Sequence, residues 1–182
     1  MAEYYEFEVS LRGAKPRLWR RFQLRKTATF QDLHDAIQDA CGWEDCHLFS
    51  FATSFGRNAE EIATGIPPGA AFDEPEAPPA SKVKLKSYFE YEAKCGYVYD
   101  FGDGWQHDIK CTPIVAESRF KRRLIDGKGT FPPEDCGGLW GFERCVNVFK
   151  GKEEDEEGLK EWLGDWTPNN FSLAEVREKF DQ

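Results

Sequence analysis

The stretch YVYDFGDGWQHDIKCTPIV, residues 97–115, decides how this chain folds. Residues 97–101 and 105–115 predict two antiparallel strands, because the Asp103-Gly104 pair between them is a strong signal for a short hairpin. A two-residue turn would place Asp100 directly opposite His107, with Cβ atoms about 5 Å apart. A three-residue turn would instead place Tyr99 opposite His107.

This hairpin supports two interpretations. In the functional one, the Asp100 carboxylate holds the His107 imidazole in one tautomer and raises its pKa, as acid–base and metal sites require. In the structural one, Asp100 and Asp103 cap the turn and His107 is a satisfied core residue. Since aspartate favours turns through backbone hydrogen bonding alone, the structural interpretation is the better supported of the two.

Upstream of the hairpin, residues 5–11 and 18–24 alternate apolar with polar side chains, which predicts two strands joined by a turn at residues 13–16. A helix is expected to open at Thr29 and to end at Gly42. Residues 48–51 resemble a further strand.

The remaining segments are read from turn residues and helical spacing. Residues 56–80 contain five Pro and three Gly and predict one long loop. Residues 126–138 predict a turn-rich connection. Helices are expected at residues 85–89, at 139–149, around Leu159 to Leu163, and after Ser172, which forms a capping-box pattern with Glu175.

This order of elements predicts a single α+β domain over residues 1–182, with an antiparallel or mixed sheet packed against helices. Alternating βαβ units are absent from the pattern, as are the glycine fingerprints that bind phosphates. A nucleotide enzyme of the doubly wound type is therefore not expected.

Composition narrows the class of protein further. The chain has 182 residues, 15% aromatic residues and a net charge of −9, so it can form a core and is a poor nonspecific coat for nucleic acid. It has no apolar run of membrane-spanning length and no apolar signal core, so no membrane association is expected. Six cysteines without a CxxC motif predict reduced thiols in a cytoplasmic protein.

Metal-ligating residue types are present, although their spacing is not diagnostic. His34, His47 and His107 are all the histidines of the chain, and with nearby carboxylates they would suffice for a divalent metal ion. The segment Cys41-x4-Cys46-His47 is similar to half a zinc site, which Cys136 and Cys145 could complete. Because the second spacing is not typical, buried thiols are the favoured interpretation.

Two further segments carry candidate functions. In residues 132–138, PPEDCGG, exposed amides could hold an anion while Glu134 acts as a base or ligand; the alternative is a stiff corner with Asp135 capping the next helix. A basic strip between Arg12 and Lys26 offers Arg17, Trp19, Arg20 and Arg21 as nucleic-acid contacts. The alternative there is a solvated strand face.

Four ordered blocks resemble the plasmid pRiA4b ORF-3-like family. They are Pro16-x-x-Trp19-Arg20-Arg21, the block from Leu33-His34 to His47-Leu48, the block from Tyr97 to His107, and residues 132–138. The segment Thr167-Pro168-Asn169-Asn170-Phe171 departs from the family's Asp-Pro-x-x-Phe. The resemblance implies a compact, roll-like α+β domain without an established activity, and some members carry a resolvase-like label from mobile elements.

Three functions follow as hypotheses. The leading one is a binding or interaction module with an unidentified ligand or protein partner, and the sequence favours it over an enzyme without excluding one. Its pocket residues are expected to be His34, His47, Asp100, Asp103, Trp105, His107, Glu134 and Asp135. The second is metal-assisted hydrolysis, with His34, His47 and His107 or Asp100 as ligands and Glu134 as general base. The third is a nucleic-acid-associated accessory protein that reads phosphates with the arginine strip.

Overall fold

A seven-stranded sheet in the order β4-β3-β5-β6-β1-β2-β7, with every neighbouring pair antiparallel, forms the frame of the molecule. The computed structural model describes residues 2–67, 69, 77–117, 119–156 and 158–182. The strands are Ala2–Leu11 (β1), Trp19–Arg25 (β2), Phe49–Ala52 (β3), Glu61–Thr64 (β4), Lys94–Tyr99 (β5), Trp105–Ala116 (β6) and Arg122–Lys128 (β7).

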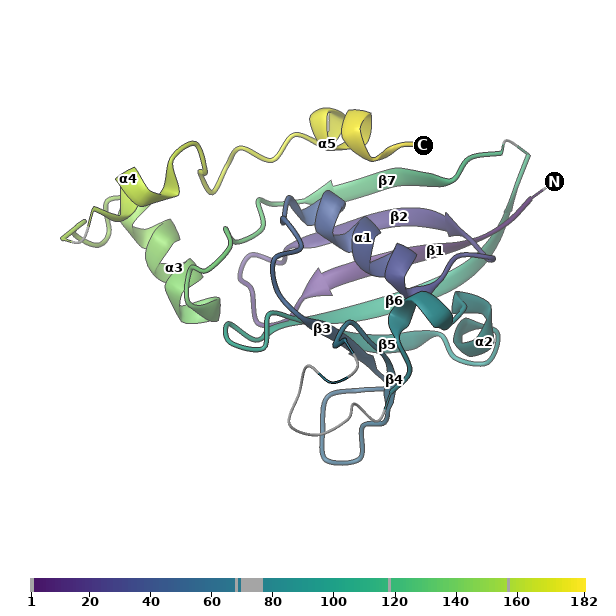
Figure 1. The fold of residues 1–182 in the computed structure, drawn as a ribbon. Coiled ribbons are helices and arrows are strands. Elements are labelled where there is room, and N and C mark those ends of the chain that lie inside the picture. The colour runs from purple at the N-terminus through teal and green to yellow at the C-terminus, as the bar shows by residue number, and fades with distance from the viewer. Residues whose placement is uncertain (1, 68, 70–76, 118, 157) are drawn as a thin grey trace.

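The helices lie on one side of the sheet and around its rim (Figure 1). They are Phe30–Cys41 (α1), Leu85–Phe89 (α2), Gly138–Phe149 (α3), Leu159–Leu163 (α4) and Leu173–Phe180 (α5), with a 3-10 turn at Ala80–Lys82. Helix α1 crosses one face, α5 follows the edge strand β7, and α3 sits at the end of the sheet where the β5–β6 hairpin turns. The chain is thus a single compact α+β domain, as the sequence predicts.

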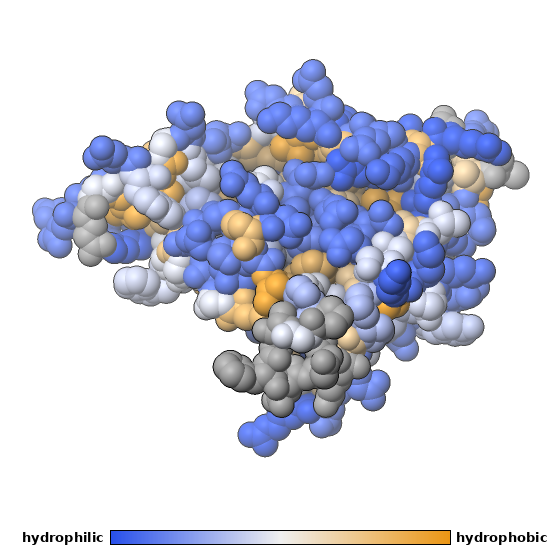
Figure 2. Space-filling view, viewed as in Figure 1, coloured by the Kyte–Doolittle hydropathy of each residue, from blue (hydrophilic) through white to orange (hydrophobic). Residues whose placement is uncertain are grey.

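The core lies between α1 and the covered face of the sheet. The period of two in β1 turns Phe7 and Val9 into this layer, where both are fully buried. Helix α1 contributes Leu33 and Ile37 to the same layer; they are spaced about one helical turn apart and are equally buried. The face of the molecule seen in Figure 2 is mostly hydrophilic, with small apolar spots.

Helix α1 begins and ends where the sequence predicts. The Thr29 hydroxyl accepts a hydrogen bond from the Asp32 amide, and the Asp32 carboxylate accepts one from the Thr29 amide, which completes a capping box. Gly42 closes the helix in the left-handed conformation, with φ of 81°. These two caps fix where the loop that follows, residues 43–48, leaves the helix.

The predicted hairpin exists, but both predicted registers are wrong. Tyr97 pairs with His107 and Tyr99 with Trp105, so residues 100–104 form a five-residue loop and Asp100 lies beyond the paired strands. Asp100 causes this outcome, because its φ of 54° turns the chain out of the strand. Its carboxylate then accepts a hydrogen bond from the Gly102 amide, and its carbonyl accepts one from the Gly104 amide.

Two strands lie where the sequence predicts loops. Strand β4 falls inside the expected 56–80 loop, of which residues 68 and 70–76 lie outside the described part of the chain. Strand β7 begins before the expected 126–138 connection and runs into it. In the part of the chain that the structure describes, no helix has the length and apolar character that a membrane crossing needs.

Candidate functional site

Three segments far apart in the sequence meet at the end of the sheet near α3. The loop after α1 supplies Cys46 and His47, the β5–β6 loop supplies Asp100, and the corner before α3 supplies Glu134 and Asp135. These five side chains form the His47 cluster. The sequence predicts four of them as pocket residues, and Cys46 as part of a half zinc site.

The cluster is centred on one imidazole nitrogen. Nε2 of His47 lies 2.9 Å from an Asp135 oxygen, 3.7 Å from an Asp100 oxygen and 4.0 Å from Oε2 of Glu134. Within the described residues, none of these oxygens meets the nitrogen with hydrogen-bond geometry, although the nitrogen is shielded from solvent. Three carboxylates therefore converge on a polar atom without satisfying it.

Glu134 is held in a fixed orientation. Its Oε1 atom accepts hydrogen bonds from the Glu44 amide at 2.9 Å and from the Tyr99 hydroxyl at 3.0 Å. Its Oε2 atom is buried and has no partner among the described residues. Oε1 therefore anchors the side chain, while Oε2 faces His47 and is free to bind a ligand.

Tyr99 is a functional neighbour that the sequence analysis missed. Its ring is fully buried, and its hydroxyl also accepts a hydrogen bond from the Cys46 amide at 3.1 Å. Burial, and then the hydrogen bond and charge of Glu134, raise the pKa of this phenol well above its usual value. Tyr99 therefore stays protonated, and its hydroxyl links the Cys46 loop to the Glu134 corner. The one sequence signal for this was strand spacing: Tyr99 comes two residues after Tyr97, so both side chains point to the same, buried face of the sheet.

Asp103 joins the hairpin loop to the corner without entering the cluster. Its carboxylate accepts a hydrogen bond from the Gly137 amide at 3.0 Å. A Cβ atom on Gly138 would lie 2.8 Å from the Asp103 carbonyl oxygen, so only glycine permits this close approach. The predicted proximity of the hairpin and the PPEDCGG corner is therefore present in the structure, with Asp103 as its brace.

The other two histidines lie outside the His47 cluster. His34 is fully buried in α1, where Nδ1 contacts the Tyr97 hydroxyl at 2.8 Å and Nε2 contacts Asp45 at 2.7 Å. Burial lowers the pKa of His34, and Asp45 opposes that shift. The structure therefore gives His34 a carboxylate partner of its own.

His107 is a core residue. It is fully buried among Trp43, Tyr97 and Phe131, and neither ring nitrogen has a partner of good hydrogen-bond geometry among the described residues. The predicted Asp100–His107 pair is thus wrong. Trp105 is likewise buried, and its ring centroid lies 6.2 Å from that of Trp43.

The basic strip is largely internal or paired. Arg20 is only 2% exposed, so it cannot contact a nucleic acid as expected. Arg17 pairs with Glu8 at 2.7 Å, while Arg21 lies 3.5 Å from Asp126. Trp19 is half-buried and has the guanidinium groups of Arg17 and Arg21 over its ring. Three of the four predicted contacts remain near the surface.

The aspartates that lie beside His34 and His47 share an unusual backbone conformation. Among the described non-glycine residues, only Asp45, Asp100 and Asp135 have positive φ, between 54° and 56°. Each one places its carboxylate within 4 Å of a histidine, either His34 or His47. Such conformations cost energy and concentrate at functional sites, and aspartate is among the residues that best tolerate them.

Comparison with known proteins agrees with the motifs. Residues 3–175 match the model of the plasmid pRiA4b ORF-3-like protein family. The chain belongs to this family. A relative in Sinorhizobium fredii, the uncharacterised protein y4hQ, is 31% identical over 180 residues, which cover 94% of this chain and 89% of the relative.

A solved structure is also similar to this chain. The crystal structure of MM3350 from Methanosarcina mazei, a protein of unknown function, superposes with a TM-score of 0.79 at 32% identity and covers 97% of both chains. None of these relatives has an assigned activity. Function must therefore be argued from the site itself.

Proposed function

We propose that this protein is a binding module that holds a divalent transition-metal ion between His47, Asp100 and Asp135. The observation that carries this proposal is the convergence of carboxylate oxygens on Nε2 of His47 at 2.9 and 3.7 Å without hydrogen-bond geometry. Ligand atoms that share a zinc ion at about 2.1 Å stand about 3.4 Å apart in tetrahedral geometry. The cluster is close to that spacing.

The donor set indicates the kind of metal. One imidazole with carboxylates suits zinc and other first-row divalent ions, whereas calcium and magnesium prefer oxygen ligands alone. Glu134 offers its unpartnered Oε2 as a further ligand atom. The Cys46 thiol is another, since the ligand atoms of Cys46, His47 and Glu134 lie within 4.8 Å of one another. A hollow of about 490 Å³ lies beside the cluster and is lined by Cys46, His47 and Leu48 among others.

Hydrolysis receives less support from this geometry. The ligand set expected for a hydrolase needs His34 and His107, and both lie outside the His47 cluster. All six cysteines are free thiols, which supports the further proposal that the protein works in the reducing cytoplasm.

The proposal is tested by calorimetric titration of the chelator-treated protein with zinc and manganese. Asp100→Asn and Asp135→Asn remove a charged ligand yet keep a residue that tolerates positive φ. Each is expected to weaken metal binding at least about tenfold, since even outer-shell partners of a metal matter by that factor.

Asp45→Asn is the matched control. It alters a third aspartate with the same backbone conformation, but one that contacts His34 and not His47. Its metal affinity is expected to equal that of the wild type. If the wild type bound neither metal, or if all three variants bound like the wild type, the proposed site would be wrong.

A further inference from the structure

The uncovered face of the sheet carries a positively charged hollow that the His47 cluster does not involve. This hollow has a volume of about 600 Å³ and lies over β1, β5 and β6, between the turn that follows β1 and the loop that follows β3. Four cationic side chains line it, against two acidic ones, in a chain whose net charge is −9. The cations are Arg12, Arg17, Lys94 and Lys110, and the acids are Glu8 and Asp108.

Both acidic groups already have partners. Glu8 accepts a hydrogen bond from Arg17 at 2.7 Å, and Asp108 lies 3.4 Å from Arg12. Arg12 also lies over the Phe55 ring, at 4.6 Å from its centroid. The two arginines therefore line the hollow in fixed positions, because the Glu8 and Asp108 carboxylates bind them and also neutralise their charge.

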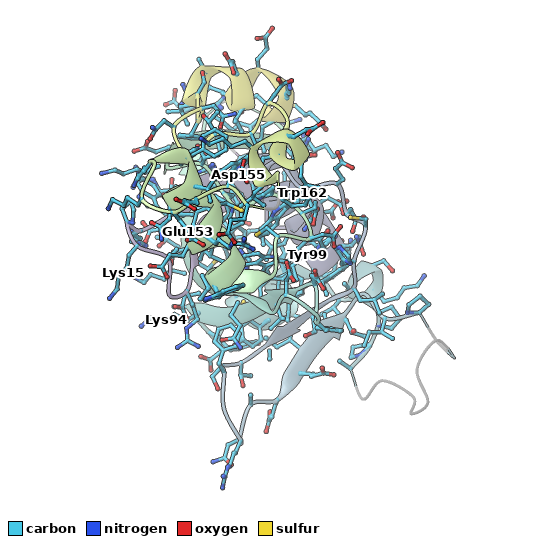
Figure 3. The ribbon with its side chains drawn as sticks, turned by 90° about the vertical axis from the view of Figure 1, so that its left-hand side faces the viewer. Lys15, Lys94, Tyr99, Glu153, Asp155 and Trp162 are labelled. Atoms are coloured by element: carbon cyan, nitrogen blue, oxygen red, sulfur yellow. The ribbon has the colours of Figure 1, made fainter. Side chains whose placement is uncertain are left out.

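Among the residues that the structure describes, the two lysines form no ion pair of their own: the carboxylate of Glu8, which lies opposite Lys110 on β1, is bound by Arg17. Lys94 and Lys110 lie directly opposite each other on β5 and β6, so their side chains emerge on the same face. In the described residues, neither amino group has a carboxylate within 4 Å. Like charges in directly opposed positions destabilise a sheet, and an anion between them would remove that cost. In Figure 3, Lys94 projects outward on the left of the view, away from Tyr99.

The floor of the hollow favours a compact ligand with a small apolar part. Phe55 lies against Gly96, where a Cβ atom would come within 2.7 Å of the ring, so the glycine makes room for it. The Ser10 and Ser54 side chains add hydroxyl groups at the margin. A long polyanion would in addition meet Glu6 and Asp126 beside Arg21, and the repulsion of an acidic protein.

We infer that this hollow is a binding site for a small phosphate-bearing molecule, with Lys94 and Lys110 as the principal contacts. Lysine acts on phosphate as a point charge. Inorganic phosphate and an organic phosphate monoester share this chemistry. The site is independent of the proposed metal site, because the two share no residue.

The test measures binding of inorganic phosphate, and of adenosine monophosphate, by calorimetry and by the shift of the thermal unfolding midpoint. The chelated protein is used, so that phosphate cannot bind through a metal at the His47 cluster. The paired variant Lys94→Gln/Lys110→Gln is expected to weaken binding of at least one probe by about tenfold per lysine, because each charged hydrogen bond is worth about that factor. Tighter binding of the monophosphate would identify an organic ligand.

Lys82→Gln/Lys152→Gln is the matched control, since it removes the same charge at two exposed lysines outside the hollow. Its affinity is expected to equal that of the wild type. Without phosphate, the hollow variant is expected to unfold at the same temperature as the wild type or higher, because a like-charge pair is removed.

Three results would overturn the inference. One is the absence of binding to either phosphate probe, and another is an equal loss of binding in both paired variants. The third is binding of a single-stranded oligonucleotide that depends on Lys94 and Lys110 while neither small probe binds.

Discussion

His107 is a neutral histidine that the fold holds in an aromatic surrounding. Burial lowers its pKa from 6.5 to about 4, and the neighbouring peptide groups of Tyr97 and Trp105 oppose that shift only weakly. An unfolded chain therefore binds a proton at this position, between those two pH values, that the native protein does not bind. The contribution of neutral His107 to the free energy of unfolding is therefore complete above pH 6.5 and is lost as the pH falls toward 4.

We expect the free energy of unfolding to drop by about 3 kcal/mol through His107 as the pH falls over that window. Urea titrations at a series of pH values measure this loss. His107→Phe keeps a ring among Trp43, Tyr97 and Phe131 but cannot be protonated, so its stability is expected to vary less with pH. His34, whose pKa burial also lowers, contributes a loss of the same sign in both proteins. Identical slopes for wild type and variant would contradict this assignment.

Helix α3 shows how an element positions the site. A Cβ atom on Gly141 would lie only 1.6 Å from the carbonyl oxygen of Cys136, so the corner at 132–138 packs directly on the helix backbone. Gly to Ala in a helix normally stabilises by about 1 kcal/mol. Here we expect Gly141→Ala to destabilise by about 2 kcal/mol, because the corner must move away.

The same displacement is expected to weaken binding at the proposed metal site, since Glu134 and Asp135 belong to that corner. Thermal unfolding and metal titration of the variant measure the two effects. Gly56→Ala serves as the control, because no atom lies within 4 Å of its added Cβ and its φ is not positive. A Gly141→Ala protein as stable as the wild type would show that the corner yields freely.

The elements also show what sequence patterns can predict. Helix α1 was predictable from Thr29 to Gly42 because its caps are local interactions. The hairpin register was not, because the backbone of Asp100 overrides the turn that Asp103-Gly104 favours. Strand β7 was missed since only Leu124 among its residues is buried, and the C-terminal helix α5 covers it through long-range contacts.

For the candidate site, residue types in the sequence indicated which side chains could take part, but not the direction in which each side chain points. The sequence predicts His47, Asp100, Glu134 and Asp135 as pocket residues, and the structure brings them together. It groups His34 and His107 with them because all three are histidines in family motifs. Which way each ring points depends on strand register and on Asp45, and neither is encoded in a short motif.

At the scale of the whole molecule, Arg20 connects parts that are distant in the chain. Its guanidinium donates to the carbonyls of Ala40 near the end of α1, of Lys128 at the end of β7, and of Gly129 just after it. It also lies 3.8 Å from the centroid of the Phe171 ring. Burial lowers the pKa of this group to about 10, which still leaves it charged at neutral pH.

Arg20→Lys is therefore expected to destabilise the protein by about 3 kcal/mol, because an ammonium group cannot reach the several carbonyls that the guanidinium satisfies. Arg17→Lys, three residues earlier and paired with Glu8 at the surface, is expected to cost less than about 0.5 kcal/mol. Urea denaturation compares the two. Equal midpoints would mean that the internal cation does not hold these segments together.

The scattered origin of the His47 cluster has a consequence for how the protein matures. Because residues 47, 100 and 135 lie in three loops that only the folded chain brings together, a nascent or misfolded polypeptide offers no complete chelate. If the proposed metal ion binds there, it binds only the folded protein and shifts the folding equilibrium toward it by mass action. Metal uptake would then report the completion of folding, and metal scarcity in the cell would shorten the lifetime of the protein.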